Sequence, residues 1–339
     1  MSDKLKELTK KKQELARQKP LSPQTLKNLE EWLRVELTYS SNAIEGNTLS
    51  RIETAEVLEK GVSAALKGKP LKDQLEAINH SKALDFIKTL AKEKKSHQFI
   101  GEEDIKAIQR IILTGIMDDQ AGRYRQSDVF ITGADVEFHS PQKVPYLMRK
   151  FIKWLEGSQG QHPVRVAADA HFKLVSIHPF ADGNGRTARL LMNLILIINS
   201  YPMAIIRNED RTEYIDAVNQ GHTKGELEPY YSIIEDAVER SLDGYLNAAQ
   251  RKPVIPVLMG KDKDIKLLKI GELAKAAGET KATIRFWTEE GLLQVAKFTK
   301  SGYALYDPKM IDKAKEIRQL QKTERLSIAE LKKRLNKPT

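Results

Sequence analysis

Apolar residues recur three and four positions apart through most of residues 22–250, and this spacing constrains the fold more than any other feature of the chain. It places apolar side chains on one face of an α-helix. After Ser22-Pro23, a suitable N-cap and first turn, four leucines mark such a face: Leu26, Leu29, Leu33 and Leu37. More helices are expected near 51–60, 73–94, 102–114, 144–156, 164–177, 186–199, 211–222 and 229–247. The sequence therefore predicts an all-α, mainly helical core.

Residues 128–139 are the exception to this pattern. Two short β-prone runs surround a turn that contains Gly133. Such a pattern is typical of a β-hairpin. A hairpin beside a helical core could hold an extended peptide.

The length of 339 residues indicates two or three domains. Residues 251–264 contain two prolines, a glycine and mixed charges, which is typical of a linker. We therefore expect an N-terminal helical region at 1–100, a core at 101–250, the linker at 251–264 and a small domain at 265–339.

The chain contains no cysteine, which excludes disulfides and thiolate metal sites and favours a reducing, cytoplasmic location. The lysine-rich stretch 1–20 lacks the apolar segment of a signal peptide. The longest apolar run, 190–198, is interrupted by Asn193 and is too short to span a bilayer. We expect no membrane role.

Positive charge is concentrated at the C-terminus. Residues 261–339 hold 19 Lys and Arg against 11 Asp and Glu, whereas the other 260 residues hold 37 against 35. This excess is typical of a surface that binds a polyanion, although a solvated helical surface gives the same count.

The loop between the helices expected at 164–177 and 186–199 reads His-Pro-Phe-Ala-Asp-Gly-Asn-Gly-Arg-Thr-Ala-Arg, residues 178–189. Gly183 and Gly185 permit tight turns, and the first amides of the following helix favour an anion. Arg186 and Arg189, three positions apart, lie on one side of that helix and can each grip phosphate oxygens. Pairing with surface carboxylates is the alternative for both arginines.

The same loop offers a base and a metal ligand. The pKa of an ordinary histidine, about 6.5, suits His178 to accept a proton from a hydroxyl. Asp182 could hold a Mg²⁺ ion that keeps most of its waters. A single histidine after an apolar helix is more often structural, but the combined set indicates phosphoryl or nucleotidyl transfer.

Residues 178–189 resemble the motif of the Fic family at every defined position. The resemblance implies that His178 is the general base for a Ser, Thr or Tyr hydroxyl of a target protein and that Asp182 holds Mg²⁺. It implies that Gly183, Asn184 and Gly185 form an anion hole. Arg186 and Arg189 would clamp the phosphates of ATP, whose AMP is transferred.

The resemblance extends over about residues 33–237. Gly122-Arg123-Tyr124-Arg125 and the 128–139 hairpin resemble the flap that aligns a target segment by strand addition. Arg211-x-x-Tyr214 resembles the segment that shapes the base pocket, so Tyr214 is a candidate for adenine contact, with a core position as the alternative.

Ser41-Asn42-Ala43-Ile44-Glu45-Gly46 resembles the inhibitory motif of the same family. The resemblance implies that Glu45, with Ser41, pairs with Arg189 and takes the place of the γ-phosphate. A solvated glutamate near a helix end is the alternative.

The segment 269–335 resembles the winged helix-turn-helix of MerR-type regulators. The resemblance would place Lys281 and Arg285 near a DNA groove, and Lys300 and Tyr303 on the wing against phosphates. The segment lacks the long dimerising helix and the effector-binding cysteines of that family, and such folds also dock proteins.

Two functions follow. The first is a protein adenylyltransferase that uses ATP and Mg²⁺ and is inhibited by Glu45 acting on Arg189. The alternative is a DNA-binding transcriptional regulator whose Fic core senses a nucleotide without turnover. A target protein is the expected partner, DNA is a candidate partner, and the sequence is compatible with a homodimer.

Overall fold

The structure is a computed structural model that describes residues 2–18, 20–62, 66, 68–129, 138–252, 254–259, 268–293, 295, 297–298, 303–306, 310–323, 328, 330 and 331. It divides into two compact units, Met1–Met259 and Gly260–Thr339. Across the described residues, no helix combines the length and the apolar character that a membrane span requires.

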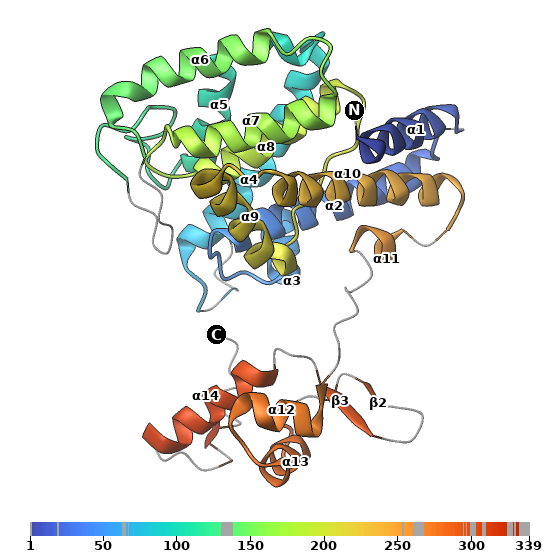
Figure 1. Cartoon of the computed structure of the whole chain (residues 1–339), viewed down its shortest axis with the longest axis vertical. Coiled ribbons are helices and arrows are strands. Elements are labelled where there is room, and N and C mark those ends of the chain that lie inside the picture. The colour runs from blue at the N-terminus through green and yellow to red at the C-terminus, as the bar shows by residue number, and fades with distance from the viewer. Residues whose placement is uncertain are drawn as a thin grey trace. The chain divides into compact units, whose positions relative to one another are not determined.

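The first unit is helical, as the apolar spacing predicts (Figure 1). Its helices are α1 Asp3–Arg17, α2 Pro23–Ile44, α3 Arg51–Lys60, α4 Leu71–Glu93, α5 Glu102–Leu113, α6 Val144–Glu156, α7 Pro163–Ile177, α8 Asn184–Ile198, α9 Arg211–Lys224, α10 Glu228–Ala249 and α11 Ile255–Leu258, with 3₁₀ turns η1 His97–Phe99, η2 Pro141–Lys143 and η3 Asn208–Asp210. The helices expected between residues 51 and 247 are all present, with ends shifted by no more than two residues.

Helix α8 lies at the centre of this unit, between α7, α4 and α5 (Figure 1). All residues from Leu190 to Leu196 are buried, so α8 is enclosed on every side. Burial of a leucine or isoleucine side chain contributes about 1.5–3 kcal/mol. The polar exception, Asn193, exchanges two hydrogen bonds with the backbone of Ala204, at 2.7 and 3.2 Å. The burial of these residues and the hydrogen bonds of Asn193 therefore hold α8 in the hydrophobic core of the first unit.

Helix α1 lies in the predicted N-terminal helical region 1–100, although the sequence indicates no bounds for a helix before residue 22. Ser2 caps it by accepting a hydrogen bond from the backbone N–H of Leu5, at 3.3 Å. Leu5 and Leu8 are buried, and Lys11 pairs with Glu239 of α10 at 2.8 Å. Three leucines and one alanine among many charges are a weak pattern, and contacts with α10 and with His162 and Tyr201 hold this helix on the core.

Two expected segments are only partly described. Residues 130–137 of the expected hairpin at 128–139 lie outside the described residues. Within the expected linker 251–264, Ile255–Leu258 forms α11, and Leu258 is buried against Gly244 of α10, where a Cβ atom would collide with it. This part of the segment therefore packs on the first unit, whose boundary follows Met259.

The second unit contains helices α12 Ile270–Ala277, α13 Lys281–Glu289 and α14 Met310–Thr323. Its strands β1 Leu268–Lys269, β2 Lys297–Phe298 and β3 Ala304–Tyr306 form an antiparallel sheet in the order β1-β3-β2. Leu268 pairs with Tyr306, and Phe298 with Ala304. The predicted helix-turn-helix is present, and β2 and β3 form an antiparallel pair at the predicted wing, whose residues 299–302 lie outside the described residues.

Candidate active site

His178 is the residue that ends α7. Its backbone adopts the left-handed conformation, with φ 50° and ψ 58°, which is uncommon for a residue other than glycine. Its ring Nδ1 lies 3.3 Å from the carbonyl oxygen of Val175. Because that carbonyl only accepts, Nδ1 carries the proton and Nε2 keeps a free lone pair. The ring is thus arranged as a base.

The surroundings of this ring favour its neutral form. Burial, together with the nearby charge of Arg125, lowers the pKa of His178 to about 4, although the Val175 carbonyl and the carboxylates of Glu45 and Asp182 act in the opposite direction. The Phe138 ring packs on the imidazole, with ring centroids 4.5 Å apart. His178 is therefore unprotonated at neutral pH.

Hydrogen bonds between residues of the loop stabilise the segment after His178. Phe180 is fully buried. The Asn184 side chain accepts a hydrogen bond from the backbone N–H of Phe180 at 2.9 Å and donates one to the carbonyl of Phe180 at 2.8 Å. Gly183, with φ 79°, begins α8 and donates its N–H to Asp182 Oδ1 at 2.6 Å. The Asn184 side chain therefore closes the loop, while the next backbone amides open the helix at its positive end.

Arg125, which the sequence places only in the flap segment 122–125, also contacts the residue proposed as the base. It is buried, and its Nε donates to the carbonyl of His178 at 2.8 Å, while its backbone N–H donates to the carbonyl of Pro179 at 3.0 Å. Its other nitrogens donate to the carbonyls of Ser127 and His139, on either side of residues 130–137. It therefore ties the base to both ends of the expected hairpin. No local pattern distinguishes such an arginine from a surface one.

Arg189 projects from the first turns of α8 toward the end of α2. Its Nε donates to Ser41 Oγ at 2.9 Å, and its Nη2 donates to the Ser41 carbonyl at 2.8 Å and to Glu45 Oε1 at 2.7 Å. Burial acts to lower the pKa of Arg189, but the charge of Glu45 and the hydroxyl of Tyr214 keep it above its ordinary value. The structure thus brings Ser41, Glu45 and Arg189 together.

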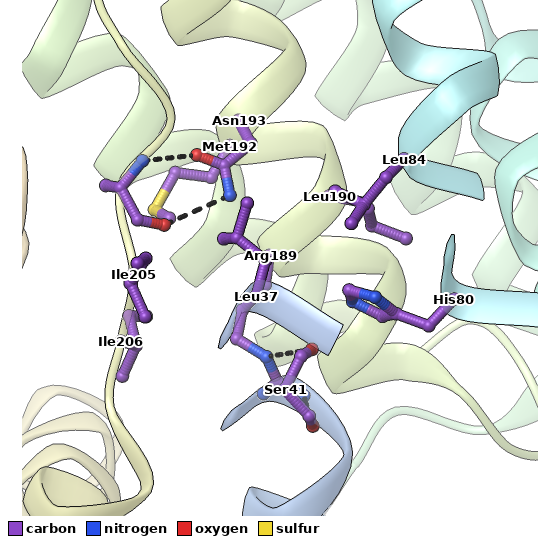
Figure 2. A pocket seen from close by; sticks show the side chains of 11 residues that line it. Leu37, Ser41, His80, Leu84, Arg189, Leu190, Met192, Asn193, Ile205 and Ile206 are labelled. Atoms are coloured by element: carbon purple, nitrogen blue, oxygen red, sulfur yellow. Dashed lines mark hydrogen bonds between the residues drawn. The ribbon is translucent and has the colours of Figure 1, made fainter. Parts of the chain in front are cut away.

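A small cavity of about 10 Å³ backs onto the same arginine (Figure 2). Arg189 turns toward Ser41 in this view, and Leu37, His80 and Leu84 also line the cavity. A volume of this size holds one water molecule at most. A nucleotide therefore cannot approach the guanidinium through this cavity.

Glu45 lies over the beginning of α8. A Cβ atom at Gly185 would collide with Glu45 Oε1, so the absence of a side chain at Gly185 makes room for this carboxylate. The Glu45 side chain is 37% exposed, against 6% for Arg189. A carboxylate in contact with Gly185 and Arg189 demonstrates that this cradle accepts an anion.

Arg186 has one donor without an acceptor. Its side chain is 2% exposed, and its Nη1 lies 3.0 Å from Glu76 Oε1. Its Nη2 donates to Asp182 Oδ1 over a long 3.4 Å. Within the described part of the chain, Nη1 is ion-paired with Glu76 without a well-oriented hydrogen bond, and Nε has no hydrogen-bond partner, which is rare for a buried donor. An unpartnered guanidinium N–H is chemically suited to a phosphate oxygen.

Asp182 is suited to a metal ion that brings its own ligands. Gly183 and Arg186 use Oδ1, and its side chain is 38% exposed. Among the described residues, no group of three or more His, Asp or Glu side chains could hold a metal. One carboxylate next to a phosphate cradle fits Mg²⁺, which takes few protein ligands and several waters.

Tyr214 is buried, and its hydroxyl lies 2.8 Å from Nε2 of His171, which is also buried. The other ring nitrogen of His171 lies 2.9 Å from the Tyr230 hydroxyl. Tyr214 therefore belongs to a hydrogen-bonded chain in the core, and an adenine contact stays a prediction.

In the second unit, two of the residues predicted to contact DNA lie on helix α13. Lys281 and Arg285 are exposed and lie one turn apart on the same face, whereas Ile284 and Trp287 are buried. Tyr303 is 71% exposed. Lys300 lies outside the described residues.

Each of the two units contains a segment that matches a known protein family. Residues 99–196 match the Fic/DOC family, and residues 268–337 match the MerR HTH family of regulatory proteins. A relative from Culex quinquefasciatus, named "Protein adenylyltransferase Fic", is 37% identical to this chain over 223 residues. The aligned residues cover 65% of this chain and 43% of that protein. The chain thus spans less than half the length of this curated relative.

Two solved structures of Fic proteins are also similar to this chain. A Fic domain containing signaling protein from Bacteroides thetaiotaomicron is 30% identical with a TM-score of 0.65, covering 74% of this chain and 100% of that one. Fic-1 (residues 134–508) from C. elegans is 31% identical with a TM-score of 0.65, covering 73% of this chain and 72% of that one.

Proposed function

Because the chain belongs to the Fic/DOC family, we propose that its first unit transfers AMP from ATP to a Ser, Thr or Tyr hydroxyl of a target protein. One observation carries this proposal. A neutral imidazole, His178, precedes a glycine-containing loop and two buried guanidinium groups, of which Arg189 holds a carboxylate beside Gly185 and Arg186 keeps an unpartnered Nε donor.

The proposed reaction uses these groups in fixed roles. Arg186, Arg189 and the first amides of α8 hold the phosphates, so that a target hydroxyl oxygen can attack the α-phosphorus. The new oxygen–phosphorus bond forms as the bond from the α-phosphorus to the bridging oxygen breaks, and pyrophosphate leaves. Nε2 of His178 takes the hydroxyl proton. Asp182 would hold a Mg²⁺ ion, which when bound neutralises phosphate charge.

Glu45 is proposed to inhibit this reaction. Its carboxylate lies 2.7 Å from Nη2 of Arg189, where it competes with a phosphate for the same donors. Ser41 holds the guanidinium in the paired position from the other side. ATP would then bind in a reactive arrangement only after Glu45 has moved away.

Labelled ATP separates the proposed chemistry from its alternatives. With the Glu45→Gly variant, label in the α-phosphate is expected on protein, while label in the γ-phosphate is not. Label from the γ-phosphate would indicate phosphoryl transfer. Nucleotide binding without any label transfer would favour the alternative, a regulator that senses a nucleotide without turnover.

The low pKa of His178 predicts an unusual pH dependence. An ordinary imidazole is roughly nine-tenths protonated at pH 5.5, and its activity as a base is then lost. With a pKa of about 4, His178 stays neutral there, and the base becomes protonated only as the pH falls through about 4. Initial rates of the Glu45→Gly variant at pH 5.5 and 7.5 are expected to agree within about twofold. Circular dichroism at both pH values checks the fold, and a tenfold loss in a folded sample would contradict the assignment.

The second unit is proposed to bind DNA through α13 and the wing. Its match to MerR-type regulators and the exposed pair Lys281 and Arg285 support this proposal. A cytoplasmic location and a homodimer stay predictions from the sequence. Docking of a protein on the same surface is the competing interpretation.

Salt dependence distinguishes DNA binding from protein docking. For DNA, the logarithm of the binding constant is expected to fall linearly with the logarithm of salt concentration, with a slope of about −0.9 for each phosphate neutralised. Arg285→Ala and Lys281→Ala should each reduce the magnitude of this slope by about 1 in a shift assay. Lys10→Ala, which changes a lysine of α1 in the first unit, is the control and should leave the slope unchanged. A slope near zero would contradict phosphate contacts.

A further inference from the structure

A second carboxylate contacts the proposed phosphate clamp. Glu76 of α4 places Oε1 3.0 Å from Arg186 Nη1, and the two side chains are 8% and 2% exposed. A guanidinium at this depth without a counter-charge would strongly destabilise the fold. Glu76, together with the more distant Asp182 at 3.4 Å from Nη2, therefore supplies the negative charge that balances the buried guanidinium of Arg186.

Glu76 is itself fixed by an amide from the segment that follows Glu45. Asn47 Nδ2 donates to Glu76 Oε2 at 2.9 Å and to the carbonyl of Asp73 at 3.0 Å. Asn47 Oδ1 accepts the N–H of Leu49 at 3.0 Å. Since the whole amide is engaged, the Glu76 carboxylate has one orientation, with one oxygen toward Asn47 and the other toward Arg186.

Glu76 and Glu45 differ in what they leave free. Glu45 is 37% exposed and lies against Gly185, in the place of an anion. Glu76 is buried and ion-paired with Nη1 of Arg186, while the Nε donor of Arg186 lacks a hydrogen-bond partner within the described residues. A carboxylate that leaves Nε free orients the arginine and does not compete for that donor.

Gly46 separates Glu45 from Asn47 along the chain, with a φ of 94°. The backbone N–H of Asn47 donates to the carbonyl of Asn42 at 3.1 Å, so Asn47 is held by the end of α2 as well as by α4. Glu45 and Asn47 therefore contact different arginine–carboxylate pairs, Glu45 the guanidinium of Arg189 and Asn47 the carboxylate paired with Arg186.

We propose that Glu76, held by Asn47, is a positioning residue for the transfer, because it keeps the Arg186 guanidinium in the orientation that receives a phosphate. This role rests on the proposed function of Arg186. It predicts that Glu76 acts on the reaction step more than on nucleotide affinity, because its carboxylate does not occupy the ligand position.

Glu76→Gln in the Glu45→Gly background keeps the shape and the Asn47 bond but removes the charge. We expect kcat to fall about 10- to 100-fold, as is typical when a group that orients a ligand-binding side chain is lost. The KM for ATP should change less than about threefold. Glu235→Gln is the matched control, since Glu235 is also a buried glutamate with one arginine contact, Arg165 at 3.1 Å. An equal loss of kcat in both variants, or no loss in Glu76→Gln, would overturn the proposal.

A second measurement does not depend on turnover. Arg186 Nε–H can be identified in an arginine-labelled NMR spectrum by comparison with Arg186→Lys. Rotation about its Cζ–Nε bond is expected to become at least about tenfold faster in Glu76→Gln and in Asn47→Ala. Asn47→Ala keeps both charges and serves if Glu76→Gln does not fold. Unchanged rotation in either folded variant would refute positioning, even if the parent transferred no AMP and the proposed function itself had failed.

Discussion

Glu45→Gly is expected to transfer AMP about 10- to 150-fold faster than the unchanged chain, because a charge-assisted hydrogen bond worth about 1.5–3 kcal/mol no longer holds Arg189. Glu45 is the C-cap residue of α2, a position that tolerates glycine, so the fold should be retained. The measurement is the initial rate of α-label incorporation, with calorimetry for ATP affinity.

Replacing Glu45 by glutamine separates the effect of its charge from the effect that glycine has on the backbone. Glu45→Gln should give an intermediate rate, since its amide oxygen still accepts from Arg189 but without charge. Glu31→Gln removes the same charge from the exposed face of α2, where Glu31 lies 3.8 Å from Lys27, and should leave the rate unchanged. Equal rates for Glu45→Gly and the unchanged chain would remove the inhibitory role of Glu45.

The second large expected effect is a loss of kcat when the His178 imidazole is removed. In the Glu45→Gly background, removal of the His178 imidazole is expected to lower kcat about 10²- to 10⁴-fold, the usual contribution of a general base. ATP affinity should stay the same, because the ring contacts Val175 and Phe138 and not the two arginines. Rapid-quench rates and calorimetry on the same samples separate these two quantities.

The backbone of His178 decides which substitution to use. With φ 50°, an alanine there would be strained, whereas asparagine tolerates the left-handed conformation. His178→Asn should therefore lose activity and keep its melting temperature, and His178→Ala should lose both activity and some stability. His162→Asn is the matched control at the other end of α7, where asparagine is also a good N-cap. Transfer by folded His178→Asn at the parent rate would rule out His178 as the base.

Much of this site was predictable because it is local in sequence. Residues 178–189 hold the base, the glycines and both arginines within one turn and the start of one helix, so their proximity needs no tertiary information. The pairing of Glu45 with Arg189 was predicted only through a resemblance, since the two residues are 144 positions apart. The contacts of Arg125 and Glu76 were missed, because they come from packed elements and leave no pattern along the chain.

The sequence by itself determined most of the helices, the loop of residues 178–189 and the separate C-terminal domain, because apolar spacing, glycine and capping residues act over a few neighbouring positions. Tertiary structure alone decided that the expected regions 1–100 and 101–250 form one compact unit, that Glu76 meets Arg186, why His178 is neutral, and that α1 folds against α10. Burial and ion pairing depend on residues brought together from distant parts of the chain, so charge state and partner choice follow from packing.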